Sequence, residues 1–233
     1  MKLKEPSRKL SAPQAEPKVT KSRILIVDDH PLFRHGLRDL INAENDLEPC
    51  GDAESAPLAL DAIRKLNPDL VIVDISLKGT NGIELIKSIK AEHPKLPMLV
   101  VSMHDESLYA VRALRAGARG YVMKQEALDR VMSAMRQVLR GEIYVSPTMS
   151  GRMISEFVQG ETGDSITDKL TDRELEVLQL IGEGLGVQEI AHQLNLSAKT
   201  VESHRAHIKE KFNFKTAREV ARFAVQWVEQ QTA

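Results

Sequence analysis

One pattern repeats five times between residues 23 and 140, and it restricts the fold more than any other feature of the chain. Each repeat has a short β-branched run, then turn residues, then a segment with helical periodicity. Strands that alternate with helices predict a doubly wound α/β fold, a five-stranded parallel sheet with helices on both faces. The five runs are Arg23–Val27, Pro49–Ala53, Leu70–Asp74, Pro97–Ser102 and Gly120–Lys124.

The runs and the helices between them agree with a buried sheet. ILIV in the first run and LVIV in the third are continuously apolar, as strands covered on both faces are. Ligands of such sheets bind at the carboxyl ends of the strands. The intervening helices are expected near Leu32–Asn42, Pro57–Leu66, Ile83–Glu92, Ser107–Ala116 and Leu128–Arg140.

The segment 169–233 carries helical signals throughout. Thr171 and Glu174 have the spacing of a capping box, which predicts a helix start. A helix over Val187–Leu194 is joined by a turn of three residues to another helix that starts after Ser197. So short a connection predicts a helix-turn-helix, whose second helix enters the major groove of DNA. We therefore expect a small all-α domain of four helices.

Two segments fall outside these domains. Ser146 before Pro147 predicts an N-cap and a short helix in the linker, and the polar, Gly-rich stretch 159–165 predicts flexibility. The start of the chain is basic, Pro-rich and without apolar periodicity, which indicates a disordered tail that is either a solvated leader or weakly attracted to DNA phosphates. The predicted organisation is a tail over 1–22, the α/β domain over 23–142, the linker over 143–168 and the helical domain over 169–233.

Composition excludes several classes of protein. The 233 residues have a hydrophobic fraction of 42%, which excludes wholesale disorder. No apolar run is long enough to cross a membrane and no signal peptide is present, so we expect a cytoplasmic protein. The single cysteine, Cys50, forms no internal disulfide. The net charge of −1 does not exclude nucleic-acid binding, because the tail and the stretch 196–212 are locally basic.

Polar side chains collect at the strand ends. Asp28 and Asp29 end the first strand, Asp74 the third, Ser102 the fourth and Lys124 the fifth. Three carboxylates on one edge repel one another unless a cation is present, and Mg²⁺ is the hard ion that prefers such oxygen ligands. An aspartate can accept a phosphoryl group, and a nearby ammonium and hydroxyl suit its oxygens. The edge thus predicts a Mg²⁺-assisted phosphoryl site.

The helix over 199–212 has a core side and an outer side. Val201, Ile208 and Phe212 fall together on a helical wheel and predict the buried face. Small residues opposite them, such as Ser203 and Ala206, would let the helix enter a groove while basic flanks meet phosphates. A solvated surface helix would look similar, and the tight turn before it favours DNA.

Two stretches carry a family resemblance. Val27-Asp-Asp-His-Pro-Leu-Phe-Arg-His-Gly-Leu37 resembles the opening of receiver domains in two-component response regulators of the NarL/FixJ family. The stretches 170–178 and 189–205 resemble the LuxR-type DNA-binding domain of the same family. Together the resemblances cover residues 23 to about 230.

The resemblance implies roles at the strand ends. Asp74 would be the phosphoacceptor, and Asp29, Asp74 and the Ser76 carbonyl would bind Mg²⁺, with Asp28 acting through water. Ser102 would be the switch hydroxyl and Lys124 the lysine that pairs with phosphate. The switch aromatic would be Tyr121, expected to repack inward upon phosphorylation. Lys78 and Gln125 stand where many receivers have proline.

The resemblance also implies surfaces in the C-terminal domain. The last helix, near 216–231, would pair two copies on two-fold DNA sites and would also complete a four-helix core, with some positions serving each purpose. The residues expected at the dimer interface are Val220, Ala221, Ala224, Val225 and Val228. Those expected at or beside DNA are Lys199, Thr200, Glu202, Ser203, Arg205, Ala206 and Lys209.

The function implied is a phosphorylation-dependent transcriptional regulator, with no substrate turnover. Its partners would be a sensor histidine kinase, double-stranded DNA and a second copy of the chain. Three alternatives stay open. An aspartate-nucleophile phosphatase would carry a second acid where Ser76 stands, and a flavodoxin-like module would want a Ser/Thr/Gly phosphate loop in place of Asp-Asp-His. The third is a regulator that works without phosphorylation.

Overall fold

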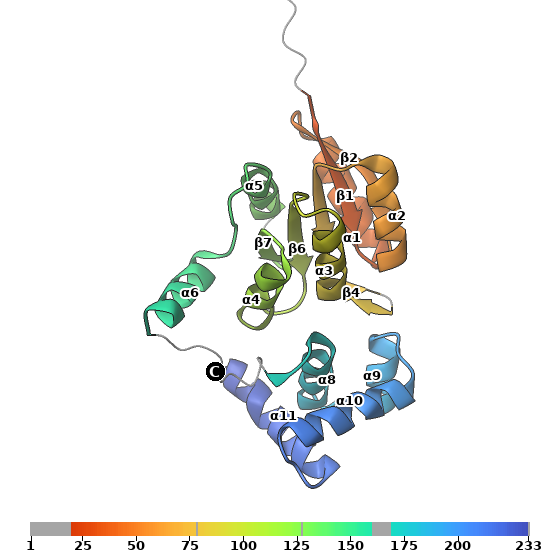
Figure 1. The fold of residues 1–233 in the computed structure, drawn as a ribbon, viewed down its shortest axis with the longest axis vertical. Helices are drawn as coiled ribbons and strands as arrows, with labels where there is room; N and C mark the ends of the chain where they lie inside the picture. Colours follow the sequence, from red (N-terminus) through yellow and green to blue (C-terminus); the bar gives the residue numbers. More distant parts are fainter. Residues whose placement is uncertain (1–19, 78, 127, 160–168, 233) are drawn as a thin grey trace, which may run out of the picture.

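The computed structural model describes residues 20–77, 79–126, 128–159 and 169–232. Its main sheet has five parallel strands in the order β2-β1-β3-β6-β7, the doubly wound order with the chain reversing beside β1 (Figure 1). The strands are β1 Ser22–Val27, β2 Leu47–Ala53, β3 Leu70–Val73, β6 Met98–Ser102 and β7 Gly120–Met123. The predicted fold class is confirmed, with element ends moved by one or two residues.

Helices cover both faces of this sheet. On one face α1 and α5 pack against Ile24, Ile26 and Ile72, and on the other α2, α3 and α4 pack against Leu25, Val27 and other strand residues. The continuous apolar runs follow from this, because successive side chains of each central strand enter opposite cores. The bounds are α1 Pro31–Asn42, α2 Ala56–Leu66, α3 Gly82–Glu92, α4 Glu106–Ala116 and α5 Leu128–Leu139.

A small hairpin that sequence patterns did not predict follows β3. Its strands are β4 Ser76–Leu77 and β5 Thr80–Asn81, which pair antiparallel. Gly82 then begins α3, and a Cβ added to it would lie 2.0 Å from the carbonyl oxygen of Asp74. This close approach requires glycine and fixes the loop that carries Asp74 against the start of α3.

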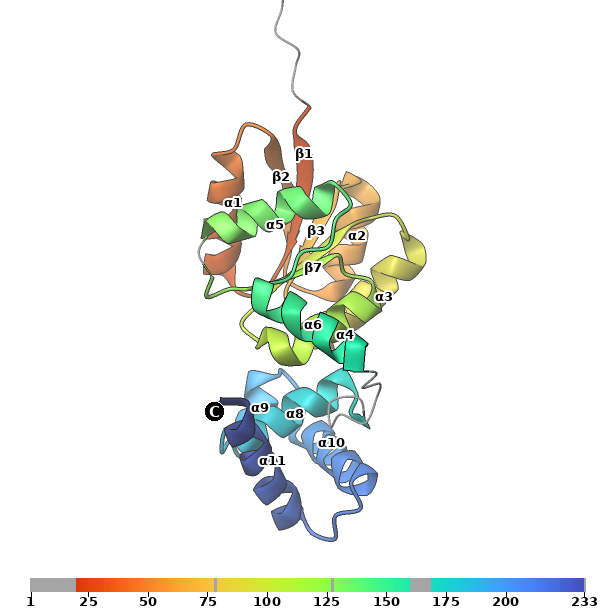
Figure 2. The ribbon, with the colours of Figure 1, turned by 90° about the vertical axis from the view of Figure 1, so that its left-hand side faces the viewer.

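The linker begins as part of the sheet. Tyr144 forms a parallel bridge with Gly120, and its carbonyl accepts a 2.9 Å hydrogen bond from the Tyr121 amide. Helix α6, Pro147–Gln159, follows with Ser146 as its N-cap, as predicted, and the Ser146 hydroxyl also donates to Glu106 of α4. Both ribbon views place α6 beside α4 (Figure 2). The predicted flexible stretch falls largely on residues 160–168, which lie outside the described residues, as does most of the predicted tail.

Four helices, α8 to α11, make up the C-terminal domain in the described residues 170–232. The capping box of Thr171 and Glu174 is present at the start of the first. Gly182 lies against α11, where an added Cβ would come within 2.5 Å of the Ala224 carbonyl. The helices are α8 Asp172–Gly182, α9 Val187–Gln193, α10 Ala198–Lys211 and α11 Ala217–Thr232.

Hydrogen bonds join α8 to the first domain, and α9 lines a cavity between the two domains. In both ribbon views these helices lie next to the receiver-like domain, with α10 and α11 beyond them. Among the described residues, no helix is long and apolar enough to cross a membrane.

Candidate functional site

Five predicted side chains converge at the carboxyl edge of the sheet. Asp28 and Asp74 are buried at 2% exposure, and Ser102 is fully buried. The Lys124 ammonium lies 2.6 Å from a carboxylate oxygen of Asp28 and 2.6 Å from one of Asp74. The phenyl ring of Phe33 lies 4.4 Å beneath the same ammonium. A single cation thus bridges two buried carboxylates.

The other acidic side chain, Asp29, lies on the solvent side of this pair. His30 Nδ1 is 2.8 Å from Asp29 Oδ1, and the His30 backbone amide donates to Asp28 Oδ1 at 2.8 Å. Asp28, Asp29, His30 and Asp74 each offer one metal-binding atom within 4.8 Å of the others. His30 is the member of this group that sequence reasoning missed, although it follows Asp29 directly.

The electrostatics of the pocket favour an added cation. Burial, and next the negative charge of Asp74, raise the pKa of Asp28. Asp74 Oδ1 is buried and has no hydrogen-bond partner among the described residues. An oxygen-rich donor set with an orphaned carboxylate oxygen fits Mg²⁺, which takes carboxylates, carbonyls and water. The residues present therefore suit the ion that the sequence predicted.

Ser102 and Tyr121 are linked through His104. The His104 amide reaches Ser102 Oγ at 3.4 Å, and the Tyr121 hydroxyl donates to the His104 carbonyl at 2.8 Å. Tyr121 has 0% exposure. In this state the Tyr121 hydroxyl is bound to His104, and the role of Tyr121 as the switch aromatic stays a prediction about the phosphorylated protein.

The DNA-binding-like domain covers this pocket. A cavity of about 520 Å³ lies between the two domains, with Asp29, Asp74 and Ser76 on one side. The side chains that line it from the other domain include Glu176 and Gln179 of α8, Glu183 at the C-cap of α8, and His192 of α9. We call it the interdomain cavity.

Polar contacts hold the domains together around this cavity. The Asn81 amide donates to Glu176 at 2.7 Å. Farther along the interface, Asp172 accepts from Arg112 at 2.5 Å and from Lys87 at 3.2 Å. The Asn81 contact joins the hairpin to α8. The two contacts of Asp172 join α3 and α4 to the start of α8.

Two titratable groups face each other in this interface. Burial raises the pKa of Glu176 to about 7, although Arg173 opposes the shift. Burial also lowers the pKa of His104 to about 4, with the positive charges of Lys124 and Arg173 adding to the effect. His104 Nε2 is 2.9 Å from the hydroxyl of Ser76. The sequence carried no signal for Glu176, because its partners lie in the other domain.

Helix α10 presents the predicted outer face to solvent. Val201 and Ile208 are buried and Phe212 packs against the core, as expected. Glu202 forms a 3.1 Å ion pair with Arg205. Among the residues expected at DNA, Lys199, Glu202, Ser203 and Ala206 are exposed, and Thr200, Arg205 and Lys209 are half-buried.

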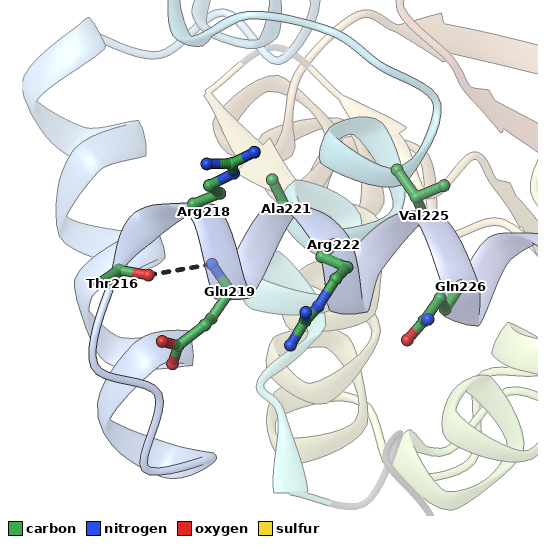
Figure 3. A pocket seen from close by; sticks show the side chains of 7 residues that line it. All are labelled: Thr216, Arg218, Glu219, Ala221, Arg222, Val225 and Gln226. Carbon is green, nitrogen blue, oxygen red and sulfur yellow. Dashed lines mark hydrogen bonds between the residues drawn. The ribbon is translucent and has the colours of Figure 1, made fainter.

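The last helix corrects part of the predicted dimer surface. Val220 is 1% exposed and Ala224 0%, so both belong to the core of their own domain. Val225 is 38% exposed, and Ala221 and Val228 are half-buried. A shallow hollow on α11 is lined by Ala221, Val225 and the arginines 218 and 222 (Figure 3). The face of α11 that packs in the core of its own domain is the face that lies against Gly182.

These features define a class of protein: a receiver domain joined to a helix-turn-helix DNA-binding domain. Residues 24–136 match the response regulator receiver domain family, and residues 168–224 match the LuxR family of bacterial regulatory proteins. The chain belongs to this family of response regulators. It is a phosphorylation-dependent DNA-binding transcriptional regulator, and the match favours this reading over a phosphatase or a flavodoxin-like module.

Relatives and solved structures agree with this membership. The chain is 35% identical over 209 residues to oxygen regulatory protein NreC of Staphylococcus carnosus, covering 87% of this chain and 96% of that one. A LuxR-family response regulator from Aurantimonas sp. is 33% identical and covers 60% of this chain and 99% of its own, with a TM-score of 0.56. RcsB from Salmonella enterica, bound to promoter rprA with phosphomimetic BeF3-, is 27% identical over 88% of this chain and 99% of its own, with a TM-score of 0.58.

Proposed function

We propose that Asp74 is the residue of this regulator that accepts the phosphoryl group. A carboxylate oxygen of Asp74 attacks the phosphorus of a phosphohistidine on a sensor histidine kinase, the N–P bond breaks, and the histidine leaves. The orphaned, buried Asp74 Oδ1 is the observation that carries this proposal, since Oδ2 is already bound to Lys124. After transfer, Lys124 and Ser102 would bind phosphoryl oxygens in place of their present partners.

The proposed Mg²⁺ ligands are Asp29, Asp74 and the Ser76 carbonyl, with Asp28 holding a water ligand. The ion would neutralise charge on the transferring phosphoryl oxygens. The raised pKa of Asp28 supports the proposal, because a cation beside it would relieve the repulsion from Asp74.

Phosphorylation would weaken the contact between the domains. Glu176 and Glu183 line the interdomain cavity opposite Asp74, so a phosphoryl group adds negative charge that faces carboxylates. The phosphoryl group would therefore destabilise the closed arrangement relative to the separated one. Such a difference in stability between two arrangements is what a switch requires. We therefore expect phosphorylation to favour separation of the domains over residues 23–142 and 169–233.

Once released, the C-terminal domain would bind DNA as a pair. The outer face of α10 would supply Lys199, Ser203, Arg205 and Lys209. The hollow on α11 would pair two copies through Ala221 and Val225 (Figure 3), whereas Val228 lies on the side of α11 that packs against Gly182. Val220 and Ala224 stabilise the domain instead.

The experiment is phosphorylation with an acyl-phosphate donor and Mg²⁺, with gel filtration and DNA affinity measured before and after. We expect a labile acyl phosphate on the wild type and tighter DNA binding. Asp74→Asn should take up no label, and Asp105→Asn, at the exposed N-cap of α4, should behave as wild type. Full labelling of Asp74→Asn would reject the acceptor, and unchanged DNA affinity and oligomeric state in the labelled wild type would favour a regulator that works without phosphorylation.

A further inference from the structure

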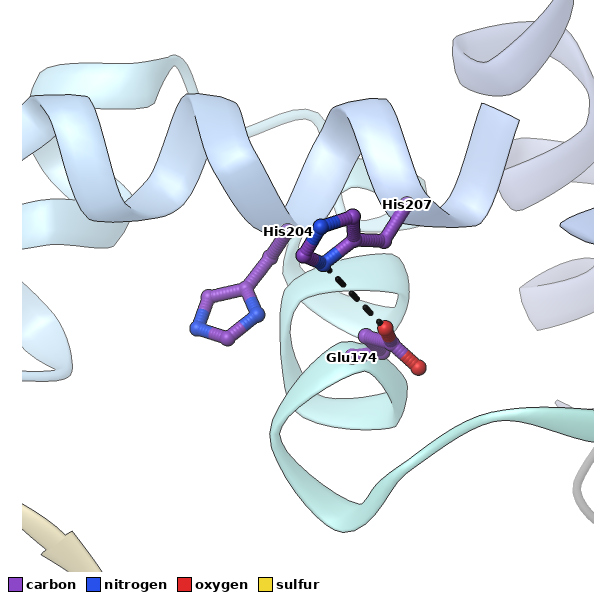
Figure 4. Close-up of side chains that lie close together, drawn as sticks. All are labelled: Glu174, His204 and His207. Carbon is purple, nitrogen blue, oxygen red and sulfur yellow. Dashed lines mark ion pairs between the residues drawn. The ribbon is translucent and has the colours of Figure 1, made fainter. Parts of the chain in front are cut away.

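Three metal-binding side chains meet in the DNA-binding domain, far along the chain from the phosphoryl site. Glu174 comes from the first turn of α8, and His204 and His207 come from α10 (Figure 4). One ligand atom of each lies within 4.8 Å of the others. The histidines are three residues apart on a helix, so both project from the same side.

His204 has a buried nitrogen with nothing to bind. Its Nδ1 has no hydrogen-bond partner among the described residues. Figure 4 shows a ring nitrogen of His204 on the side that faces His207 and Glu174. Burial lowers the pKa of His204 and outweighs the opposing charge of Glu174, which favours the neutral ring that a metal ligand requires. A buried ring nitrogen without a partner is a cost that a bound metal ion would remove.

The two carboxylate oxygens of Glu174 have different partners. Oε2 accepts from the Lys211 ammonium at 2.6 Å and from the Thr171 amide at 2.8 Å. Oε1 faces the histidines, with His207 Nδ1 3.7 Å away. The Glu174 side chain is 4% exposed and that of His207 is 59% exposed. The cluster therefore has a buried half, which holds Glu174, and an exposed half, which holds His207.

We infer that Glu174, His204 and His207 form a binding site for Zn²⁺ that joins the start of α8 to the middle of α10. Two imidazole nitrogens and one carboxylate oxygen with an open fourth position make a three-ligand zinc set, and imidazole selects against Mg²⁺. Metal–ligand distances of about 2 Å require the atoms to draw together. The exposed His207 side chain provides that movement. The bound ion would add positive charge at the edge of the surface expected to meet DNA phosphates.

The first test is a Zn²⁺ titration of the full chain against a chromophoric chelator, with Mg²⁺ in excess. His207→Asn should weaken zinc binding by more than about tenfold, whereas His207→Cys, which offers a thiolate, should keep it. Glu174→Gln should also weaken binding, and glutamine preserves the capping box, so the helix start is retained. His192→Asn, an exposed histidine of α9, is the matched control and should bind as wild type.

The receiver pocket contains the competing zinc site, because His30 lies beside three carboxylates there. His30→Asn should leave high-affinity zinc binding intact. Imidazole ¹⁵N shifts should move on His204 and His207 when Zn²⁺ is added, and the thermal midpoint should rise in wild type but not in His207→Asn. Zinc affinity that is lost in His30→Asn, or unchanged in His207→Asn, would overturn the site, as would a wild type without saturable binding.

Discussion

The side-chain amide of Asn81, in the receiver, donates a 2.7 Å hydrogen bond to the carboxylate of Glu176, in the DNA-binding domain. These residues are 95 positions apart in the chain, and Glu176 is 1% exposed. A buried carboxylate beside the phosphoryl site makes the closed arrangement sensitive to charge. The interface therefore lends itself to direct tests.

The first prediction concerns pH. The pKa of Glu176 is about 7 in the closed arrangement against an ordinary value of 4.5, so the contribution of Glu176 to closure is full below about pH 4.5 and is lost as pH rises through about 7. In Glu176→Gln this part of the pH dependence should vanish. Interdomain energy transfer measured between about pH 5 and about pH 8 in both proteins checks it, as the difference between the wild type and Glu176→Gln, each of which retains His104. Glu183→Gln, at an exposed position, should retain the wild-type profile, and a Glu176→Gln profile equal to it would contradict the prediction.

The second prediction concerns the contact between α4 and α8. In Arg112→Ala, the buried Asp172 keeps Lys87 at 3.2 Å as its remaining cationic partner among the described residues. The loss should favour separation by about 2 kcal/mol, a shift of roughly 30-fold in the closed-to-separated ratio. Small-angle scattering should show a more extended chain without phosphorylation. Arg130→Ala, on the exposed surface of α5, is the control, and equal scattering from both variants would refute the role of Arg112.

The third prediction concerns Lys124. Its ammonium neutralises Asp28 and Asp74, so Lys124→Ala leaves two buried carboxylates without their shared partner. The free energy of unfolding at neutral pH should fall by about 3 kcal/mol, and added Mg²⁺ should restore part of it. Urea unfolding with and without Mg²⁺ measures both effects. A loss that Mg²⁺ does not change would show that the carboxylates do not form the ion site.

The fourth prediction concerns DNA. If Lys199 and Lys209 meet phosphates, each change to alanine should reduce the slope of log affinity against log salt by about 1. Fluorescence anisotropy at several salt concentrations measures this slope. Lys65→Ala, on α2 of the receiver, should leave it unchanged, and an equal slope in all three variants would place DNA elsewhere.

The sheet could be predicted because its signals are local. The runs ILIV and LVIV predict strands that are buried on both faces, and Asp74 directly follows the last residue of the LVIV strand. The pocket could be anticipated for the same reason, since parallel strands bring their carboxyl ends to one edge.

The interdomain contacts could not be predicted from local patterns. Asn81 reads as a turn residue and Glu176 as an exposed helix position, because neither shows its partner within one helical turn. Val220 and Ala224 were misplaced for a related reason: a helix with apolar residues on adjoining faces does not reveal which face its own core takes. The approach of Gly182 to α11 decides this, and it is a tertiary contact.

The pairing of Tyr144 with Gly120 has a consequence for self-association. A parallel sheet exposes unpaired amides and carbonyls on its outermost strands, and such strands attract other chains and lead to aggregation. Here the Tyr144 carbonyl accepts a hydrogen bond from the Tyr121 amide, and the Tyr144 amide donates one to the Arg119 carbonyl. In the described part of the sheet, Tyr144 thus covers the outer edge of β7 at Gly120 and Tyr121. Two copies of the receiver that meet along this edge would therefore contact each other through side chains and would not extend the sheet.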